Sequence, residues 1–221
     1  MPHGKDIAIN LGDTDVSAFL NANAVTVNNE LADVSAYQDE DRNFLGGLIT
    51  GAVTLGGHFD VAAGAIDEEL TNSLKTATLL SVAYGPALSD RWVGMSIQAS
   101  NYTQQPPVGD VVVVNYTAQA EKGGVSRGTV LHPLANVESS AGEETKVDQG
   151  AATARGAVGF IHLVAFTGTD ITVLIEDGAT EGGAFNTLVA FAQLTGIGKE
   201  RVAVAAAADT PNRWLKVSFA G

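Results

Sequence analysis

The chain has 221 residues, of which 45% are hydrophobic, and it carries 25 acidic against 12 basic side chains, a net charge of −13. This composition supplies a sizeable core and excludes both a disordered chain and a protein that binds nucleic acid through clustered Lys and Arg. The sequence contains no cysteine, which excludes disulfides, thiolate metal sites and a cysteine nucleophile. The acidic excess fits a soluble protein, or a surface that must not hold an anionic partner.

The N-terminal stretch MPHGKDIAINLGDTD contains no apolar segment of the kind found in a signal peptide. No stretch of the chain approaches the roughly 18 consecutive apolar residues of a membrane span. We therefore expect a chain that is made in a cytoplasm, is soluble at first and makes no membrane contact.

Alternating apolar and polar residues predict short strands at residues 6–11 and 23–29. The segment 30–44 has no clean period and carries five acidic residues against one arginine. We predict a long loop there, and loops of this length in a compact domain are usually functional or flexible. The charged residues of the loop are Glu30, Asp33, Asp39, Glu40, Asp41 and Arg42.

A long strand rich in glycine is predicted at residues 48–60. Glycine inside a strand indicates a bend, a bulge or the close approach of another backbone. We expect bends at the glycines in and just before this strand. These are Gly46, Gly47, Gly51, Gly56 and Gly57.

An amphipathic helix is predicted at residues 65–77. Acidic residues lie near its start and Lys75 lies near its end, which complements the helix dipole. Ile66, Leu70 and Leu74 follow one another at intervals of four and form a single apolar stripe. We expect this stripe to lie on a sheet.

Strands separated by glycine and proline turns then follow in quick succession, with the spacing of an all-β sandwich or barrel. We expect Gly123 and Gly124 to turn a hairpin between two of them. We also expect the strands at 200–208 and 213–219 to pair with each other, and the segment 182–194 to form a short helix or a strand. The remaining predicted strands are 78–84, 91–99, 111–120, 127–134, 160–166 and 170–177.

The domain organisation follows from one change in composition. Residues 136–156 are polar, acidic and rich in Gly, Ala and Ser, so we predict a linker or long loop there. Residues 1–135 then form a β domain that contains the helix. Residues 157–221 form a C-terminal β-rich segment, which either completes the first fold or decorates its exterior.

Known catalytic and metal-binding patterns are missing from the sequence. The histidines at positions 3, 58, 132 and 162 have no partner at metal-ligand spacing. The sequence has no HExxH motif, no nucleophile elbow and no Gly-Lys-Ser/Thr phosphate loop. Two acidic repeats, at 13–15 and 39–43, lack the glycine and the glutamate of a calcium loop. We expect no catalytic residue, no cofactor and no metal.

A family resemblance is carried by the stretch DVSAFLNANAVTVNNELADVSAYQDEDRNFLGGLITGAVTLGGHFD. It resembles the opening of the major tail protein, or tail tube protein, of long-tailed, siphovirus-type bacteriophages. The shared features are a strand, an acidic loop, a Gly-Leu-x-x-Gly junction, a strand that ends in Gly-x-Phe-Asp, and a short helix. The resemblance covers roughly residues 6–135, and the last third of the chain resembles a β-sandwich segment found at the end of many virion proteins.

The resemblance implies a mostly β fold of the tail-tube type, a sandwich or barrel with one short helix, followed by a C-terminal β-sandwich segment. It implies a structural virion protein without catalysis, which polymerises into stacked rings, usually six-fold, that form the tail tube. The implied location is the virion tail, after assembly in the cytoplasm of the bacterial host.

The implied partners are copies of the same chain and other tail proteins, namely the tape measure, the tail terminator and the distal tail protein. Viral DNA would pass through an acidic conduit during ejection without specific binding, because like charge keeps the polyanion off the wall. The loop 30–44 would reach the adjacent ring or subunit, and the glycine-rich strand after it would form part of the wall. The acids at 39–41 would pair with Arg42, Arg91 or Arg127 of a neighbour.

Two alternatives stay open. A β-sandwich module that binds a carbohydrate or a cell surface would need aromatic platforms, and Trp92 and Trp214 are the only tryptophans. The inner tube of a contractile injection system shares the same physics as a non-contractile tail tube. A hydrolase on a β scaffold ranks last, because no catalytic constellation is present.

Overall fold

The computed structural model describes residues 4–33, 44–60, 66–106, 110–134, 136–205 and 211–221. These residues are mostly in β-strands, with one α-helix, and the predicted fold class is confirmed. No helix among them is long and apolar enough to span a membrane.

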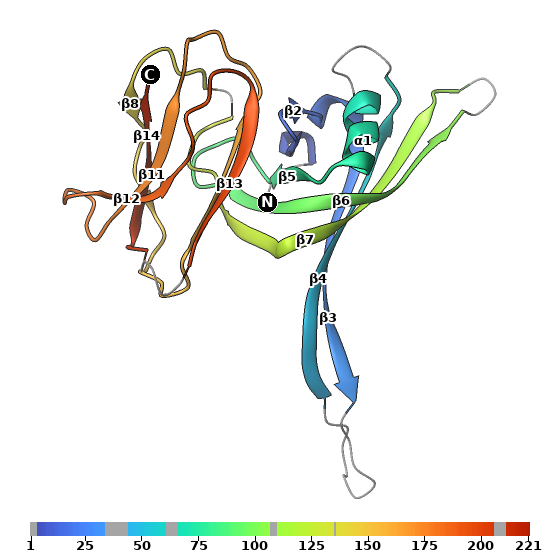
Figure 1. Cartoon of the computed structure of the whole chain (residues 1–221), viewed down its shortest axis with the longest axis horizontal. Helices are drawn as coiled ribbons and strands as arrows, with labels where there is room; N and C mark the ends of the chain where they lie inside the picture. Colours follow the sequence, from blue (N-terminus) through green and yellow to red (C-terminus); the bar gives the residue numbers. More distant parts are fainter. Residues whose placement is uncertain (1–3, 34–43, 61–65, 107–109, 135, 206–210) are drawn as a thin grey trace, which may run out of the picture. The chain divides into compact units, whose positions relative to one another are not determined.

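A seven-stranded sheet runs in the order β2-β1-β5-β6-β7-β4-β3 (Figure 1). The strands β1 and β2 pair antiparallel, as do β1 and β5, β3 and β4, and β4 and β7. The bounds are β1 (Ala8–Leu11), β2 (Thr14–Asp15), β3 (Leu20–Asp33), β4 (Phe44–His58), β5 (Thr78–Ala83), β6 (Arg91–Gln105) and β7 (Val113–Thr129). Short 3-10 turns lie at Gly4–Asp6 and Ser17–Phe19, and α1 spans Ile66–Lys75.

Two smaller sheets follow in the C-terminal part of the chain. One has the order β12-β11-β14-β8, with β9 also paired to β14, and the other contains β10 and β13. Side chains from both sheets pack around one apolar cluster that includes Val173, Phe191 and Val217, so this part is a β-sandwich. The bounds are β8 (Gly142–Glu143), β9 (Val147–Asp148), β10 (Ala157–Leu163), β11 (Thr172–Gly178), β12 (Asn186–Ala190), β13 (Gly198–Val204) and β14 (Trp214–Ala220).

The chain divides into two compact units. The hairpin unit comprises Ala18–Thr78 and Met95–Ser126, and the terminal unit comprises Met1–Ser17, Leu79–Gly94 and Arg127–Gly221. The segment 136–156, for which we predict a linker, contains β8 and β9, which pair with β14. The predicted domain boundaries stay a prediction.

The predicted helix is confirmed, with its acidic residues in the first turn and Lys75 in the last. Ile66 and Leu70 are fully buried, as the predicted stripe requires. Leu74, the third member of the stripe, is 38% exposed, and Ser73 is buried in its place. Ser73 is tolerated there because its hydroxyl donates to the Leu70 carbonyl at 2.7 Å.

Two predicted pairings are wrong. Gly123 and Gly124 do not turn a hairpin, because β7 continues through them; Gly124 takes a φ of 60°, which bends a strand without ending it. The last two strands do not pair with each other, since β13 pairs with β10 and β14 pairs with β11. The chain crosses between the layers of the sandwich at this point, and alternation along one strand does not identify its neighbour. The segment 182–194 contains the strand β12.

Candidate assembly surface on the β3–β4 arm

The hairpin of β3 and β4 is far longer than the sequence predicts. The pairing runs from Leu20 opposite Gly57 to Asp33 opposite Phe44. The other edge of β4 pairs with β7 only from Ala52 to His58. Residues 27–33 and 44–51, here called the arm, therefore form a two-stranded ribbon, which runs away from α1 within the hairpin unit (Figure 1).

The described side chains of the arm are exposed to solvent almost without exception. Residues 26–31 and 47–50 are all exposed. They include large apolar side chains: Leu48 is 74% exposed, Ile49 66% and Leu31 58%. One exposed leucine is ordinary, but several on one narrow ribbon form a surface suited to contact with another protein. A two-stranded ribbon is also at best marginally stable in water, so a partner would stabilise it.

The predicted loop residues divide into two groups. Glu30 and Asp33 lie on β3 and are exposed, so this part of the predicted loop is strand. The pairing of β3 with Phe44 to Gly46 supplies the backbone hydrogen bonds that the polar sequence did not indicate. The other predicted contact residues lie outside the described residues. They are Asp39, Glu40, Asp41 and Arg42.

The glycines of β4 serve close packing rather than unusual backbone angles. Gly46, Gly47, Gly51, Gly56 and Gly57 all lie on β4, and the backbone of Gly47, Gly51, Gly56 and Gly57 has no positive φ. A Cβ atom added to Gly57 would overlap the carbonyl oxygen of Phe19, and one added to Gly51 would overlap the side chain of Val125. At Gly47 it would lie 2.9 Å from the Glu30 carbonyl oxygen, whereas at Gly56 the nearest atom is an ordinary contact at 3.5 Å.

Replacing Gly57 should therefore destabilise the base of the arm. We expect Gly57→Ala to lower the free energy of unfolding by about 1–3 kcal/mol, because rigid backbone rather than a side chain must move. Gly56→Ala is the matched control, and we expect a change from about zero to a gain of about 1 kcal/mol, since alanine restricts the unfolded chain. Urea unfolding of both variants measures the difference, and equal stabilities would contradict this account of β4.

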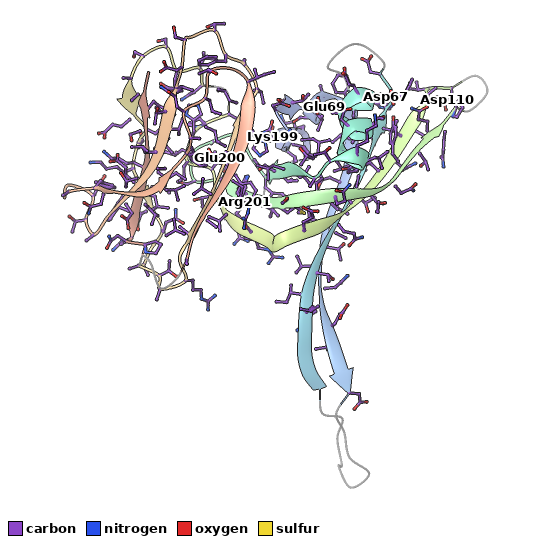
Figure 2. The ribbon with its side chains drawn as sticks, viewed as in Figure 1. Asp67, Glu69, Asp110, Lys199, Glu200 and Arg201 are labelled. Carbon is purple, nitrogen blue, oxygen red and sulfur yellow. The ribbon has the colours of Figure 1, made fainter. Side chains whose placement is uncertain are left out.

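Hydrogen bonds from β6 and β7 fasten α1 at the base of the arm. The Ser73 and Tyr116 hydroxyls lie 2.9 Å apart in the core. At the C-terminal end of the helix, the Gln98 amide donates to the Leu74 carbonyl at 3.1 Å. At the N-terminal end, Asp67 projects from the helix (Figure 2) and accepts from Tyr102 at 2.5 Å and from Gln104 at 2.7 Å. Both ends of the helix are thus tied to one strand.

The Tyr102 hydroxyl should make stability depend on pH. Burial, and next the hydrogen bond to Asp67, raise the pKa of Tyr102 from 10.0 to about 12. The folded state then holds this proton more tightly than the unfolded state does, so its contribution is complete below pH 10 and is lost as pH rises toward 12. We expect Tyr102→Phe to flatten the fall in stability over that range. Urea unfolding at intervals across it tests this, and equal slopes for variant and wild type would refute it.

One face of the β4–β7 pair is buried, and the opposite face has no charged residue from Ala52 to Gly56 of β4 and their partners on β7. The pairs Val53–Ala118 and Leu55–Tyr116 belong to the buried face. The alternate pairs, here called the open face, are Ala52 with Gln119, Thr54 with Thr117, Gly56 with Asn115, and His58 with Val113. The first three bring uncharged residues together. The open face is therefore polar and neutral over these three pairs.

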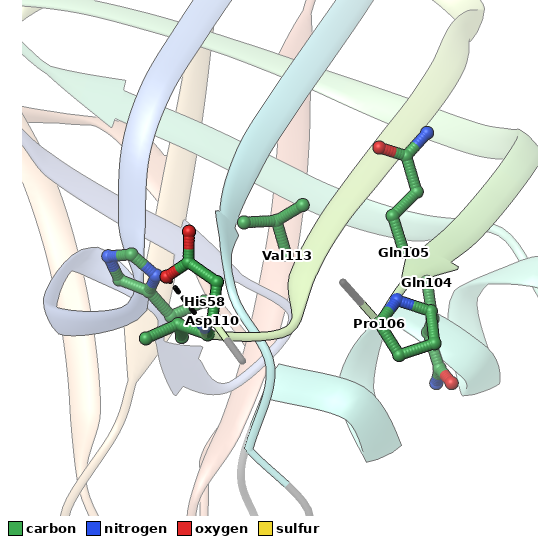
Figure 3. Close-up of a pocket in the computed structure, with 7 residues that line it drawn as sticks. His58, Gln104, Gln105, Pro106, Asp110 and Val113 are labelled. Atoms are coloured by element: carbon green, nitrogen blue, oxygen red, sulfur yellow. Dashed lines mark hydrogen bonds between the residues drawn. The ribbon is translucent and has the colours of Figure 1, made fainter. Parts of the chain in front are cut away.

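A shallow hollow lies near the end of β4 and is lined by residues of the hairpin unit (Figure 3). Its polar side chains include His58, Gln104 and Asp110. The Asp110 carboxylate accepts a hydrogen bond from the Val111 backbone at 2.7 Å, so it is used within its own turn. We find no arrangement of nucleophile, base and orienting group among the described residues of this hollow.

The described histidines lie in different surroundings. His58 is exposed at the end of β4. The His162 ring is hydrogen-bonded on both sides, donating from Nδ1 to the Gly12 carbonyl at 2.6 Å and accepting at Nε2 from the Ser81 hydroxyl at 2.7 Å. Burial lowers the pKa of His162, so this ring is neutral in the core. His132 lies beside two glutamates that the sequence does not associate with it.

No protein-family model and no curated protein matches this sequence. Solved structures are similar to part of it. The tail of an empty GTA particle, with C6 symmetry, aligns over 59% of this chain and 100% of its own, at 18% identity and a TM-score of 0.47. The SPP1 tail tube aligns over 63% and 88%, at 8% identity and a TM-score of 0.48. The sheath–tube complex of PVC, an extracellular contractile injection system, aligns over 57% and 90%, at 14% identity and a TM-score of 0.44.

These names are those of tail and tube assemblies, and each of the three TM-scores is below 0.5.

Proposed function

We propose that this chain is a structural tube subunit of the tail type, which assembles with copies of itself into stacked rings and acts without catalysis. The observation that carries the proposal is the arm, a two-stranded ribbon with exposed leucine and isoleucine side chains. Such a ribbon gains stability when its apolar side chains and its free backbone groups meet another copy. We assign the arm the contact with the adjacent ring or subunit.

Ring closure would use the two ends of the seven-stranded sheet. The strands β2 and β3 lie at these ends, and each leaves one edge without a described partner strand. Exposed sheet edges pair readily with other chains, and closed rings remove the edges. Pairing between neighbouring subunits would join their sheets into one continuous wall.

The open face is our candidate for the channel lining. Three of its four described pairs present threonine, asparagine and glutamine but no charged residue, and the fourth pair contains His58. A neutral wall on a chain of net charge −13 would not release counterions from DNA, so the polyanion would pass without being held. The acidic character of the conduit would then come from residues outside these pairs.

We assign the charged contacts of the assembly to residues between β3 and β4 in the sequence. We propose that Asp39, Glu40 and Asp41 pair with an arginine of a neighbouring subunit. Arg91 and Arg127 are exposed and form no ion pair with any residue that the structure describes. We place the assembled chain in a virion tail, with rings that are hexameric and with other tail proteins at the ends of the tube.

Electron microscopy and sedimentation over a concentration series test the proposed self-assembly. We expect the wild-type chain to form rings or tubes of uniform diameter. The double variant Leu48→Asp, Ile49→Asp should remain monomeric, because charges replace the apolar contact, while its melting temperature changes little since both side chains are exposed. Val137→Asp is the matched control: Val137 is 90% exposed and lies outside the arm.

Tubes formed equally well by the double variant would refute the role of the arm. A wild-type chain that stays monomeric at every concentration and binds a glycan in a screen would instead support the binding-module alternative.

A cation on the open face should make assembled tubes hold DNA. Asn115 is exposed and lies opposite Gly56. We expect Asn115→Lys tubes to retain DNA at low salt and to release it as salt rises, whereas wild-type and Asn115→Gln tubes retain none. Co-sedimentation of tubes with labelled DNA measures this, and equal retention by all three would show that the open face does not line the channel.

A further inference from the structure

Three side chains that follow one another at intervals of six residues in the sequence lie close together in the terminal unit. The Nδ1 atom of His132 lies 2.7 Å from Oε1 of Glu144 and 3.8 Å from Oε1 of Glu138. One possible ligand atom from each residue lies within 4.8 Å of the other two. The side chains are partly shielded, with 32% of His132, 31% of Glu138 and 12% of Glu144 exposed.

We propose that His132, Glu138 and Glu144 bind a divalent transition-metal ion, for which zinc is the best fit. An imidazole nitrogen and carboxylate oxygens are ordinary zinc ligands. With zinc–ligand bonds of about 2.0–2.2 Å, the ligand atoms of a tetrahedral site lie about 3.3 Å apart. The two measured separations, 2.7 Å and 3.8 Å, lie on either side of that value.

Two of the three ligands are held in place by the surrounding backbone. Two residues before His132, the Val130 backbone donates to the Asp90 carbonyl at 2.8 Å and accepts from Ser89 at 2.9 Å. The His132 ring also packs edge-on against Phe219, with 5.3 Å between ring centroids.

Glu144 is held in place by its neighbouring strand. The Glu144 backbone donates to the Val217 carbonyl at 2.8 Å. The preceding residues, Gly142 and Glu143, form β8, which pairs with β14. An ion would therefore meet His132 and Glu144 already positioned and would recruit Glu138.

A simple hydrogen bond between His132 and Glu144 does not account for the whole cluster. That bond uses one carboxylate, while the Glu138 carboxylate also approaches the same nitrogen. Two carboxylates close to one site repel each other, and a divalent cation between them removes that repulsion. Three protein ligands would leave a coordination position for water.

The bound ion would stabilise the terminal unit. It would tie the segment after β7 to the segment around β8, because His132 lies on the first and Glu144 on the second. An ion that binds the folded chain but not the unfolded chain raises the free energy of unfolding by mass action. This role is separate from self-assembly through the arm.

Calorimetric titration of the full, tag-free, metal-stripped chain with zinc chloride tests the site. We expect one strongly bound zinc ion per chain, and a rise in melting temperature on adding zinc. His132→Asn and Glu144→Gln should each weaken binding by at least about tenfold, since each variant loses a ligand. His58→Asn is the matched control, because His58 is exposed and lies outside the cluster; it should bind zinc as the wild type does.

Circular dichroism confirms that each variant is folded before titration, and Glu138→Gln provides a third test if one of the other variants fails to fold. Absence of zinc binding by the wild-type chain would overturn the proposal. So would equal zinc affinity in the wild type and in the folded ligand variants, which would place the ion elsewhere. Neither result would bear on tube formation.

Discussion

The hairpin unit depends on the burial of one face of α1 against the sheet. Ile66 and Leu70 are fully buried, and so are Leu55 and Met95 of the neighbouring strands. Hydrogen bonds then fix the position of the helix on the sheet, which burial alone would not define. The Ser73–Tyr116 hydrogen bond lies in the core, and Tyr102 donates to Asp67 at the start of the helix. Because hydrophobic burial is non-directional, these bonds determine which register the helix adopts.

The arm is a consequence of that anchored base. Its strands have no apolar core of their own, yet they continue the pairing of β3 with β4, with a register shift between Asn29 and Leu31. Gly57 lets the Phe19 backbone approach β4 closely, and Gly51 does the same for the Val125 side chain. The packed part of the hairpin therefore ends within a few residues of the exposed arm. The same sheet thus supplies both a stable support and a surface that is left for a partner.

Local periodicity predicted the elements whose burial alternates or repeats. The helix and β5 are found within one or two residues of the predicted limits, because their apolar residues face one core. Beyond residue 29, β3 has no such signal: Glu30 and Leu31 are exposed, and the strand there depends on pairing with β4. Which strands pair, as for β13 with β10, is likewise set by contacts remote in sequence. The glutamates beside His132 follow it at intervals of six residues, which match neither a helix nor a strand period, so the sequence does not indicate that they lie together.

The combination of an uncovered arm with a net charge of −13 has a consequence for the timing of assembly. If the arm pairs between copies as proposed, free subunits would carry an exposed ribbon that makes premature aggregation a hazard. Mutual repulsion between acidic subunits acts within about the Debye length, about 8 Å at physiological ionic strength, and would oppose the approach of two subunits. In such an assembly the charge would work as a kinetic barrier that ionic strength lowers, and it would favour growth on an existing template over spontaneous nucleation.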